Sequence, residues 1–154
     1  MEDLGLLKKI KMMIVDDEER FLSTLAKRLA EKGVYVETAS SGFEALEKIR
    51  DKSMDIVVLD IKMPQMDGIQ TLGHIKKIDS DIEVILLTGH ANVESAVEGM
   101  RLGAHDYLMK PCDLELLIEK VLDAFNKKAG REDKRIRDHV SKEMEHWQKH
   151  WSRQ

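Results

Sequence analysis

The chain has 154 residues, of which 42% are hydrophobic and 35% are charged, and its formal net charge at pH 7 is −4. This composition fits one globular domain with a short appendage, and no apolar run approaches the ~20 residues of a membrane span. Early acidic residues and the lack of an apolar N-terminal segment argue against a signal peptide. The single cysteine excludes an internal disulfide and a cysteine-rich zinc site. We therefore expect a cytoplasmic protein.

Charge is distributed unevenly along the chain. Residues 1–125 carry 16 Lys and Arg against 24 Asp and Glu, whereas residues 126–154 carry 9 against 5. An acidic body followed by a basic tail indicates two parts with different roles. We place one domain over residues 9–126 and a charged helical extension or linker over residues 127–154.

Apolar runs and helical patterns alternate along the acidic body. In chain order, strands are expected at residues 12–15, 35–39, 56–59, 84–87 and 107–109, the second and fifth being weaker. The continuous runs are typical of strands buried on both faces. A helical pattern follows each strand: the first runs from Phe21 to Leu29 and stops near Gly33, and the others have N-terminal caps at Ser41, Asp67, Asn92 and Asp113.

Five strand–helix units in succession predict an α/β fold. We expect a flavodoxin-like (βα)5 architecture, in which a doubly wound five-stranded parallel sheet is followed by a helical C-terminal extension. In such sheets, binding and chemistry gather where the strands end. The residues directly after each apolar run are therefore the candidate functional residues.

Polar side chains occupy these strand ends. Asp16 and Asp17 follow the first strand, Asp60 the third, Thr88 the fourth and Lys110 the fifth. Each alone is explained as well by a helix-terminal acid, a turn residue or a solvated lysine. The occurrence of all five polar residues at one edge of the sheet is hard to explain by five independent causes. Three neighbouring carboxylates repel one another, and Mg²⁺, which prefers oxygen ligands, relieves that repulsion.

A lysine and a hydroxyl are more than a metal site needs. They suit a phosphoryl group, whose oxygens require positive charge and hydrogen-bond donors. A carboxylate can itself accept a phosphoryl group and form an aspartyl-phosphate. Asp60 is the best candidate because it ends the central buried strand.

These residues, together with the loop from Lys62 to Gly68, resemble the receiver domain of bacterial two-component response regulators. The resemblance covers about residues 9–126. Residues 87–111 are especially similar to receivers of enhancer-binding transcription regulators. The resemblance implies a phosphorylation-activated signalling switch that catalyses only its own phosphorylation and dephosphorylation and is not otherwise an enzyme.

The resemblance also implies a role for each site residue. Asp60 accepts the phosphoryl group from a sensor histidine kinase. Asp17, Asp60 and the backbone carbonyl of Lys62 bind Mg²⁺ directly, and Asp16 supports the metal through water. Lys110 pairs with Asp60 and then with the phosphoryl oxygens.

The resemblance assigns the switch to two further residues. The hydroxyl of Thr88 moves toward the phosphoryl group, and Tyr107 turns inward into the space that Thr88 leaves. The Lys110–Pro111 bond is expected to be cis. The switch would control a downstream protein or an output domain.

Several alternatives stay open at this point. The chain is either a complete stand-alone regulator or the N-terminal part of a longer one. A scaffold that keeps the fold without accepting phosphate belongs to a different class, and the full set of acids and lysine argues against it. A metal-dependent phosphatase of the haloacid dehalogenase kind is disfavoured, because the sequence Asp60-Ile61-Lys62 lacks the second aspartate two residues on.

The basic tail carries its own pattern. Lys127, Lys128 and Gly130 predict a helix stop, after which a narrow helical stripe begins, with spacings of 4, 4, 3 and 4, at Ile136, Val140, Met144, Trp147 and Trp151. Three interpretations are a homodimer or partner contact, docking on the chain's own body, and disorder. A homodimer could form through residues 127–154 or through the Asn92–Phe125 face. No DNA-binding motif is visible, and no membrane contact is expected.

Overall fold

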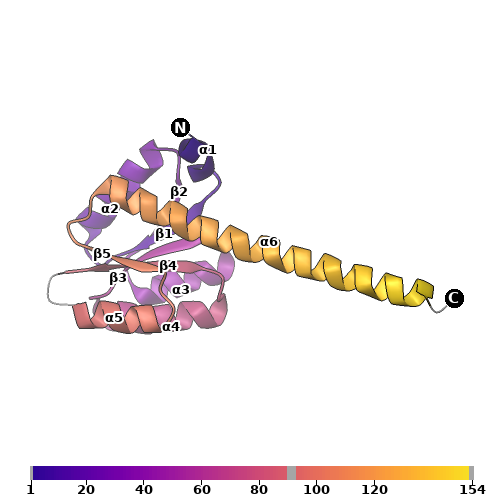
Figure 1. Ribbon diagram of the computed structural model, residues 1–154. Helices are drawn as coiled ribbons and strands as arrows, with labels where there is room; N and C mark the ends of the chain where they lie inside the picture. Colours follow the sequence, from indigo (N-terminus) through magenta and orange to yellow (C-terminus); the bar gives the residue numbers. More distant parts are fainter. Residues whose placement is uncertain (1, 90–92, 153–154) are drawn as a thin grey trace.

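The computed structural model describes residues 2–89 and 93–152. Five parallel strands form one sheet in the order β2-β1-β3-β4-β5 (Figure 1). This order is that of the flavodoxin-like fold, so the predicted fold class is confirmed. The strands are β1 (Lys11–Val15), β2 (Tyr35–Ala39), β3 (Ile56–Asp60), β4 (Glu83–Thr88) and β5 (Asp106–Met109).

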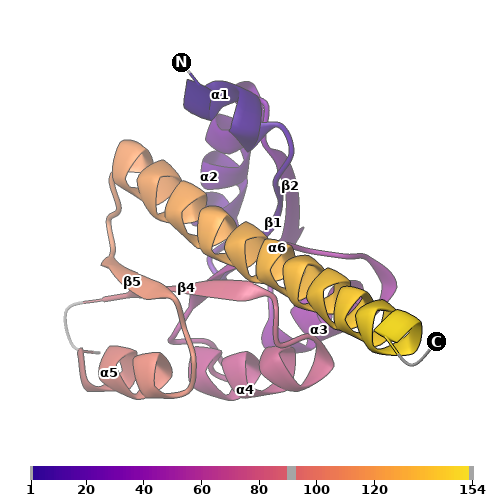
Figure 2. The same cartoon turned by 45° about the vertical axis from the view of Figure 1, so that its right-hand side comes forward.

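Six helices cover the two faces of the sheet. Figures 1 and 2 show α3, α4 and α5 on one face and α1, α2 and the first part of α6 on the other. The helices are α1 (Glu2–Leu7), α2 (Glu19–Glu31), α3 (Gly42–Asp51), α4 (Gly68–Ile78), α5 (Val93–Arg101) and α6 (Leu114–Ser152). The short helix α1 is an addition to the elements predicted from the sequence.

The central strand β3 explains why its sequence does not alternate. All five of its residues are buried. Val57 and Leu59 join the apolar cluster beneath α3, α4 and α5, and Ile56 and Val58 join the cluster beneath α1, α2 and α6. A strand with helices on both faces needs apolar side chains at every position.

The predicted helix caps are largely present. The Ser41 hydroxyl accepts a hydrogen bond from the Glu44 N–H at 3.1 Å, but the Glu44 carboxylate bonds Ser40 instead of closing the box on Ser41. Asp67 forms a complete capping box with Gln70. The cap expected at Asn92 lies outside the described residues.

The helix stop predicted at Gly130 is wrong. α6 runs without a break for 39 residues from Leu114 to Ser152. A glycine inside a helix costs only about 1 kcal/mol relative to alanine, and the long charged residues around Gly130 are good helix formers. No described helix is long and apolar enough to cross a membrane, α6 included.

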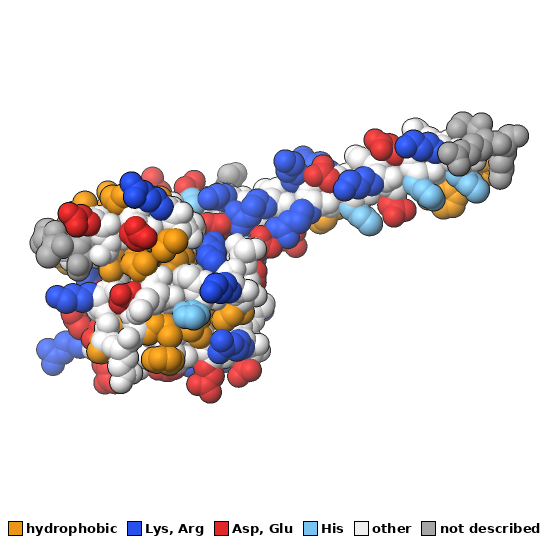
Figure 3. Space-filling model, turned by 90° about the horizontal axis from the view of Figure 1, so that it is seen from below, with side chains coloured by type: hydrophobic (Ala, Val, Ile, Leu, Met, Phe, Trp, Pro, Cys, Tyr) orange, Lys and Arg blue, Asp and Glu red, His pale blue; other side chains and the backbone are white. Residues whose placement is uncertain are grey.

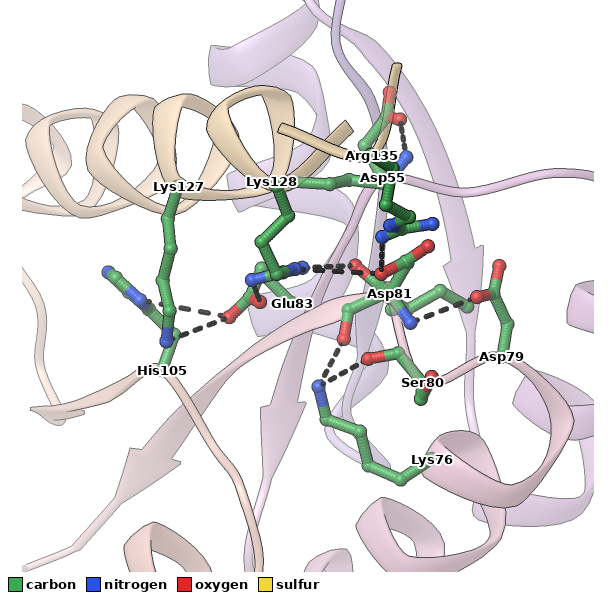
Figure 4. Close-up of polar contacts among 12 residues, drawn as sticks. Asp55, Lys76, Asp79, Ser80, Asp81, Glu83, His105, Lys127, Lys128 and Arg135 are labelled. Atoms are coloured by element: carbon green, nitrogen blue, oxygen red, sulfur yellow. Dashed lines mark hydrogen bonds and ion pairs between the residues drawn. The ribbon is translucent and has the colours of Figure 1, made fainter. Parts of the chain in front are cut away.

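Ion pairs hold the middle of α6 against the sheet (Figure 4). Arg131 Nη1 lies 2.6 Å from Glu83 Oε1 and Arg135 Nη2 lies 2.5 Å from Asp81 Oδ1. Lys128 Nζ lies 2.7 Å from Asp55 Oδ1. We call these six residues the charged clamp. It lies where β3 and β4 begin, at the opposite edge from the strand ends.

Candidate functional site

Three carboxylates converge at the carboxyl edge of the sheet. Asp16 follows β1 and Asp60 ends β3, and these two strands are hydrogen-bonded neighbours. Oxygen atoms of Asp16, Asp17 and Asp60 all lie within 4.8 Å of one another. Asp16 and Asp60 are buried, whereas Asp17 is exposed. The predicted meeting of the three acids is therefore confirmed.

Lys110 approaches the same carboxylates from the end of β5. Its Nζ lies 2.6 Å from Asp16 Oδ2 and 3.6 Å from Asp60 Oδ1. The Lys110–Pro111 peptide bond is cis, as predicted. The lysine is thus closer to Asp16 than to Asp60, where the resemblance placed its main contact.

The carboxylate of Asp60 lies in surroundings that disfavour its charge. Burial and the nearby charge of Asp16 raise the pKa of Asp60 to about 6. Lys110 and a hydrogen bond from the Lys62 backbone oppose this shift. Burial lowers the pKa of Lys110, but its hydrogen bond to Asp16 and the charges of Asp60 and Asp16 outweigh burial and raise that pKa. The site therefore combines excess negative charge with a fixed cation.

The loop after β3 folds closely against Asp60. The Gly68 N–H donates a hydrogen bond to the Ile61 carbonyl at 2.7 Å. A Cβ on Gly68 would lie 2.3 Å from the Asp60 carbonyl oxygen and 2.6 Å from the Ile61 Cα, so only glycine fits there. Gln65 has a φ of 69°, which turns the loop back on itself. An open cleft results, lined by Asp17, Glu18, Asp60, Lys62, Met63, Pro64, Gly89 and Lys110.

The predicted switch residues lie apart from this cleft. Thr88 is fully buried, and its hydroxyl donates a hydrogen bond to the Gly89 carbonyl at 3.0 Å. Tyr107 is 40% exposed on β5. Its Cα pairs with that of Leu86 on β4, two residues before Thr88. Neither side chain lines the cleft in this conformation.

Two site residues were missed by sequence reasoning. The Phe21 ring lies under Lys110, with its centroid 4.6 Å from Nζ. The Glu18 N–H donates a hydrogen bond to Asp16 Oδ1 at 2.9 Å. Phe21 gave only a helical apolar signal, and Glu18 followed two aspartates without any motif of its own. From the start of α2, Phe21 therefore contacts the site lysine and Glu18 contacts a site carboxylate.

The donor set fits a hard divalent cation. Its ligands are all oxygens, and two of the three carboxylates are buried so close together that the pKa of Asp60 rises. Mg²⁺ prefers such oxygen ligands and keeps several waters, which the open cleft leaves room for. The arrangement can therefore bind a cation beside the Asp60 carboxylate, which lines the cleft and can act as the nucleophile toward a phosphoryl group.

Comparisons with known proteins give consistent matches. The family model described as response regulator receiver domain matches residues 12–122. Transcriptional regulatory protein ZraR of Klebsiella oxytoca is 40% identical over 110 residues, covering 71% of this chain and 25% of that protein. The probable transcriptional regulator ycf27 of Guillardia theta is 42% identical over 130 residues, covering 82% of this chain and 51% of that protein.

A solved structure shows the same fold. The crystal structure of a response regulator receiver domain protein from Clostridium thermocellum has a TM-score of 0.75 and 37% sequence identity, covering 78% of this chain and 97% of that one. This chain thus spans between a quarter and about half of the two curated regulators but nearly all of a solved receiver. Its homologues include receivers of enhancer-binding transcription regulators, ZraR among them. The chain belongs to the response regulator receiver domain family.

Proposed function

We propose that this chain is a cytoplasmic phosphorylation-activated switch whose phosphoacceptor is Asp60. The observation that carries the proposal is the buried position of Asp60 close to the Asp16 and Asp17 carboxylates, with the Lys110 ammonium 3.6 Å away. A carboxylate oxygen of Asp60 forms a bond to phosphorus while the phosphorus–nitrogen bond of a kinase phosphohistidine breaks. The phosphate donor is therefore a sensor histidine kinase, which is the partner expected of a receiver domain.

Each neighbour of Asp60 has a part in this transfer. Asp17, Asp60 and the carbonyl of Lys62 would hold Mg²⁺, and Asp16 would support it from beside them. When bound, the cation neutralises charge on the phosphoryl oxygens. Lys110 supplies a second positive charge to those oxygens. The positive charges of the cation and of Lys110 offset the repulsion between the phosphoryl oxygens and the Asp60 carboxylate, so that this carboxylate can act as the acceptor.

Phosphorylation is read out through Thr88 and Tyr107. A phosphoryl group adds about −1.5 to −2 charges and new hydrogen-bond acceptors. The Thr88 hydroxyl leaves the Gly89 carbonyl, which it bonds at 3.0 Å, and donates to the phosphoryl group. Tyr107, now exposed on the neighbouring strand, turns into the space that Thr88 vacates. The changed surface controls a downstream protein or an output domain, and the named relatives point to transcription control as the output.

Intact mass tests the proposed acceptor. The chain is incubated with Mg²⁺ and acetyl phosphate beside Asp60→Asn and beside Asp51→Asn, a matched change at an exposed acid on α3. We expect one added phosphoryl group in the natural chain and in Asp51→Asn, none in Asp60→Asn, and none when EDTA removes the cation. A folded chain that gains no phosphoryl group from any donor would contradict the proposal and favour a scaffold. Sustained hydrolysis of a generic phosphate ester would favour a phosphatase.

A second experiment separates acceptor chemistry from the switch. Thr88→Ala removes the hydroxyl but leaves Asp60 and the acids in place. We expect this variant to gain the phosphoryl group, while the NMR signals of the Tyr107 ring change less on phosphorylation than in the natural chain. An unchanged Tyr107 response in Thr88→Ala would remove Thr88 from the switch.

A further inference from the structure

The second half of α6 carries large apolar side chains in solvent. Five such side chains are between 49% and 66% exposed. They lie on the part of the helix that extends beyond the body (Figures 1 and 3). Three of them, with Gln148, line a shallow apolar hollow near the helix end. We call the following five residues the apolar stripe: Ile136, Val140, Met144, Trp147 and Trp151.

The chain's own body cannot cover the apolar stripe. Residues of a helix advance by about 100° each around its axis. The side of α6 that faces the body is marked by buried Leu117, Val121 and Ala124 and by the clamp residues Arg131 and Arg135. Projected along a straight helix, that side continues through polar residues, and the centre of the apolar stripe lies about 145° away from it. The described part of the body therefore leaves the stripe free to contact a partner.

The spacing of the stripe suits a straight helical partner. Ile136 and Trp147 are 11 residues apart, and so are Val140 and Trp151. An 11-residue repeat corresponds to about 3.67 residues per turn and keeps a seam on one side of a nearly straight helix. Two such helices can lie side by side along the whole stripe.

The residues that flank the stripe favour a second copy in parallel orientation. Glu132 and Glu143 lie on one flank, and five residues after each, on the other flank, lie Arg137 and Gln148. Parallel pairing brings the opposite flanks of two helices together with this offset of five residues. Glu132 then faces Arg137 of the second copy, and Glu143 faces its Gln148. Antiparallel pairing instead brings the same flank of both helices together. It places Glu143 of one chain against Glu143 of the other, where the two negative charges repel.

The stripe is also large enough for a dimer. A buried tryptophan contributes roughly 150–250 Å², so the exposed parts of four tryptophans in two chains supply on the order of 500 Å². The three aliphatic positions of each chain and the flanks add the rest of the ~1,200 Å² that small stable interfaces bury. We propose that α6 pairs in parallel with α6 of a second copy of this chain through residues 136–151.

Oligomeric mass tests the proposal on the full chain. Sedimentation over a range of concentrations should show a particle of twice 17.7 kDa. Met144→Glu and Trp147→Glu, which put a charge into the seam, should weaken association by at least about 100-fold. Lys142→Glu, on the side away from the stripe, should not. Circular dichroism confirms that each variant is folded. A single-chain mass at every concentration, or a dimer unaffected by both seam variants, would overturn the proposal.

Cross-linking tests the orientation. In a Cys112→Ser background, Trp151→Cys should form a disulfide dimer under mild oxidation, because parallel helices bring the two copies of this position together. A mixture of Ile136→Cys chains and Trp151→Cys chains should not form mixed dimers. Mixed dimers in place of Trp151→Cys homodimers would show antiparallel pairing and overturn the orientation proposed here.

Discussion

The Asp60 carboxylate gains a proton more readily in the folded protein than in an unfolded chain. Its pKa is raised to about 6 by burial and by Asp16, whereas an unperturbed aspartate has a pKa of about 3.9. Above about pH 6, ionised Asp60 therefore lowers the free energy of unfolding. Below about pH 4 the residue is protonated in both states and this penalty disappears.

Asp60→Asn should therefore stabilise the protein in a pH-dependent way. We expect the free energy of unfolding to rise by on the order of 2 kcal/mol at about pH 7.5 without divalent cations. The gain should shrink as the pH falls from about 6 to about 4. Urea unfolding in EDTA at several pH values measures it, with Asp51→Asn as the control. A gain that does not change over this range would contradict the raised pKa.

Lys110 should matter for stability as well as for phosphoryl transfer. Asp16 is fully buried, and among the described contacts the only partner of its Oδ2 is Lys110 Nζ, at 2.6 Å. Removing one partner of a buried ion pair costs about 3–5 kcal/mol. We expect Lys110→Ala to lower the free energy of unfolding by on the order of 3 kcal/mol in EDTA. Mg²⁺ should restore part of this free energy, because its charge replaces that of the lysine.

Chemical unfolding with and without Mg²⁺ measures this effect. Lys62→Ala is the control, because its side chain is exposed beside the same cleft. It should change stability by less than about 0.5 kcal/mol. Equal losses in the two variants would show that the Lys110–Asp16 pair does not stabilise the fold.

At the residue scale, the sequence predicts which side chains meet but not how they pair. Asp16, Asp60 and Lys110 all follow apolar runs, and parallel strands bring such positions to one edge. The closer contact of Lys110 with Asp16 depends on side-chain directions, which strand position alone leaves open. Phe21 beneath Lys110 was missed for the same reason, since its spacing matched an ordinary core position on a helix.

At the element scale, α6 shows where local rules fail. Gly130 follows two lysines, which is the pattern of a helix end, yet α6 continues through it. The residues that hold this part of the helix are distant in sequence: Arg131 pairs with Glu83 and Lys128 with Asp55. Contacts across 48 or 73 residues leave no local signal. The central strands β1, β3 and β4 were easier to predict, because burial on both faces leaves continuous apolar runs.

The continuity of α6 can be tested at Gly130. No atom lies within 4 Å of the place where a Cβ would stand, so alanine fits without a clash. We expect Gly130→Ala to raise the free energy of unfolding by about 1 kcal/mol, as in a helix interior. Gly68→Ala, whose Cβ would collide with the Asp60 carbonyl, should instead destabilise the chain. Thermal unfolding compares the two, and a destabilising Gly130→Ala would indicate that the helix ends there.

At the scale of the whole molecule, the uneven charge of the chain has a structural cause. Part of the acidic excess of the body lies where β3 and β4 begin, and the basic residues at the start of the tail pair with it in the charged clamp (Figure 4). Glu83 is only 2% exposed, and a charge buried in this way needs a nearby cation, the closest of which is Arg131 of the clamp. The clamp sets the direction in which α6 leaves the body, at the sheet edge opposite the phosphoacceptor.

Loss of the clamp should free α6 without affecting the site. Arg131→Ala combined with Arg135→Ala removes the cations of two clamp pairs, with Glu83 and Asp81. Amide hydrogen exchange over residues 127–137 should then become about 10–100-fold faster, because opening a helix held by fewer contacts costs less free energy. The measurement is made in a Met144→Glu background, so that pairing between chains cannot mask the effect.

The matched control replaces two exposed cations of α6, Lys134 and Lys142, with alanine. It removes the same charge but leaves the clamp intact, and exchange over residues 127–137 should stay as it was. Phosphorylation of Asp60 by acetyl phosphate should be equal in both double variants, because the site and the clamp lie at opposite edges of the sheet. Equal exchange rates in the two variants would mean that apolar packing of α6, and not the clamp, holds the helix to the body.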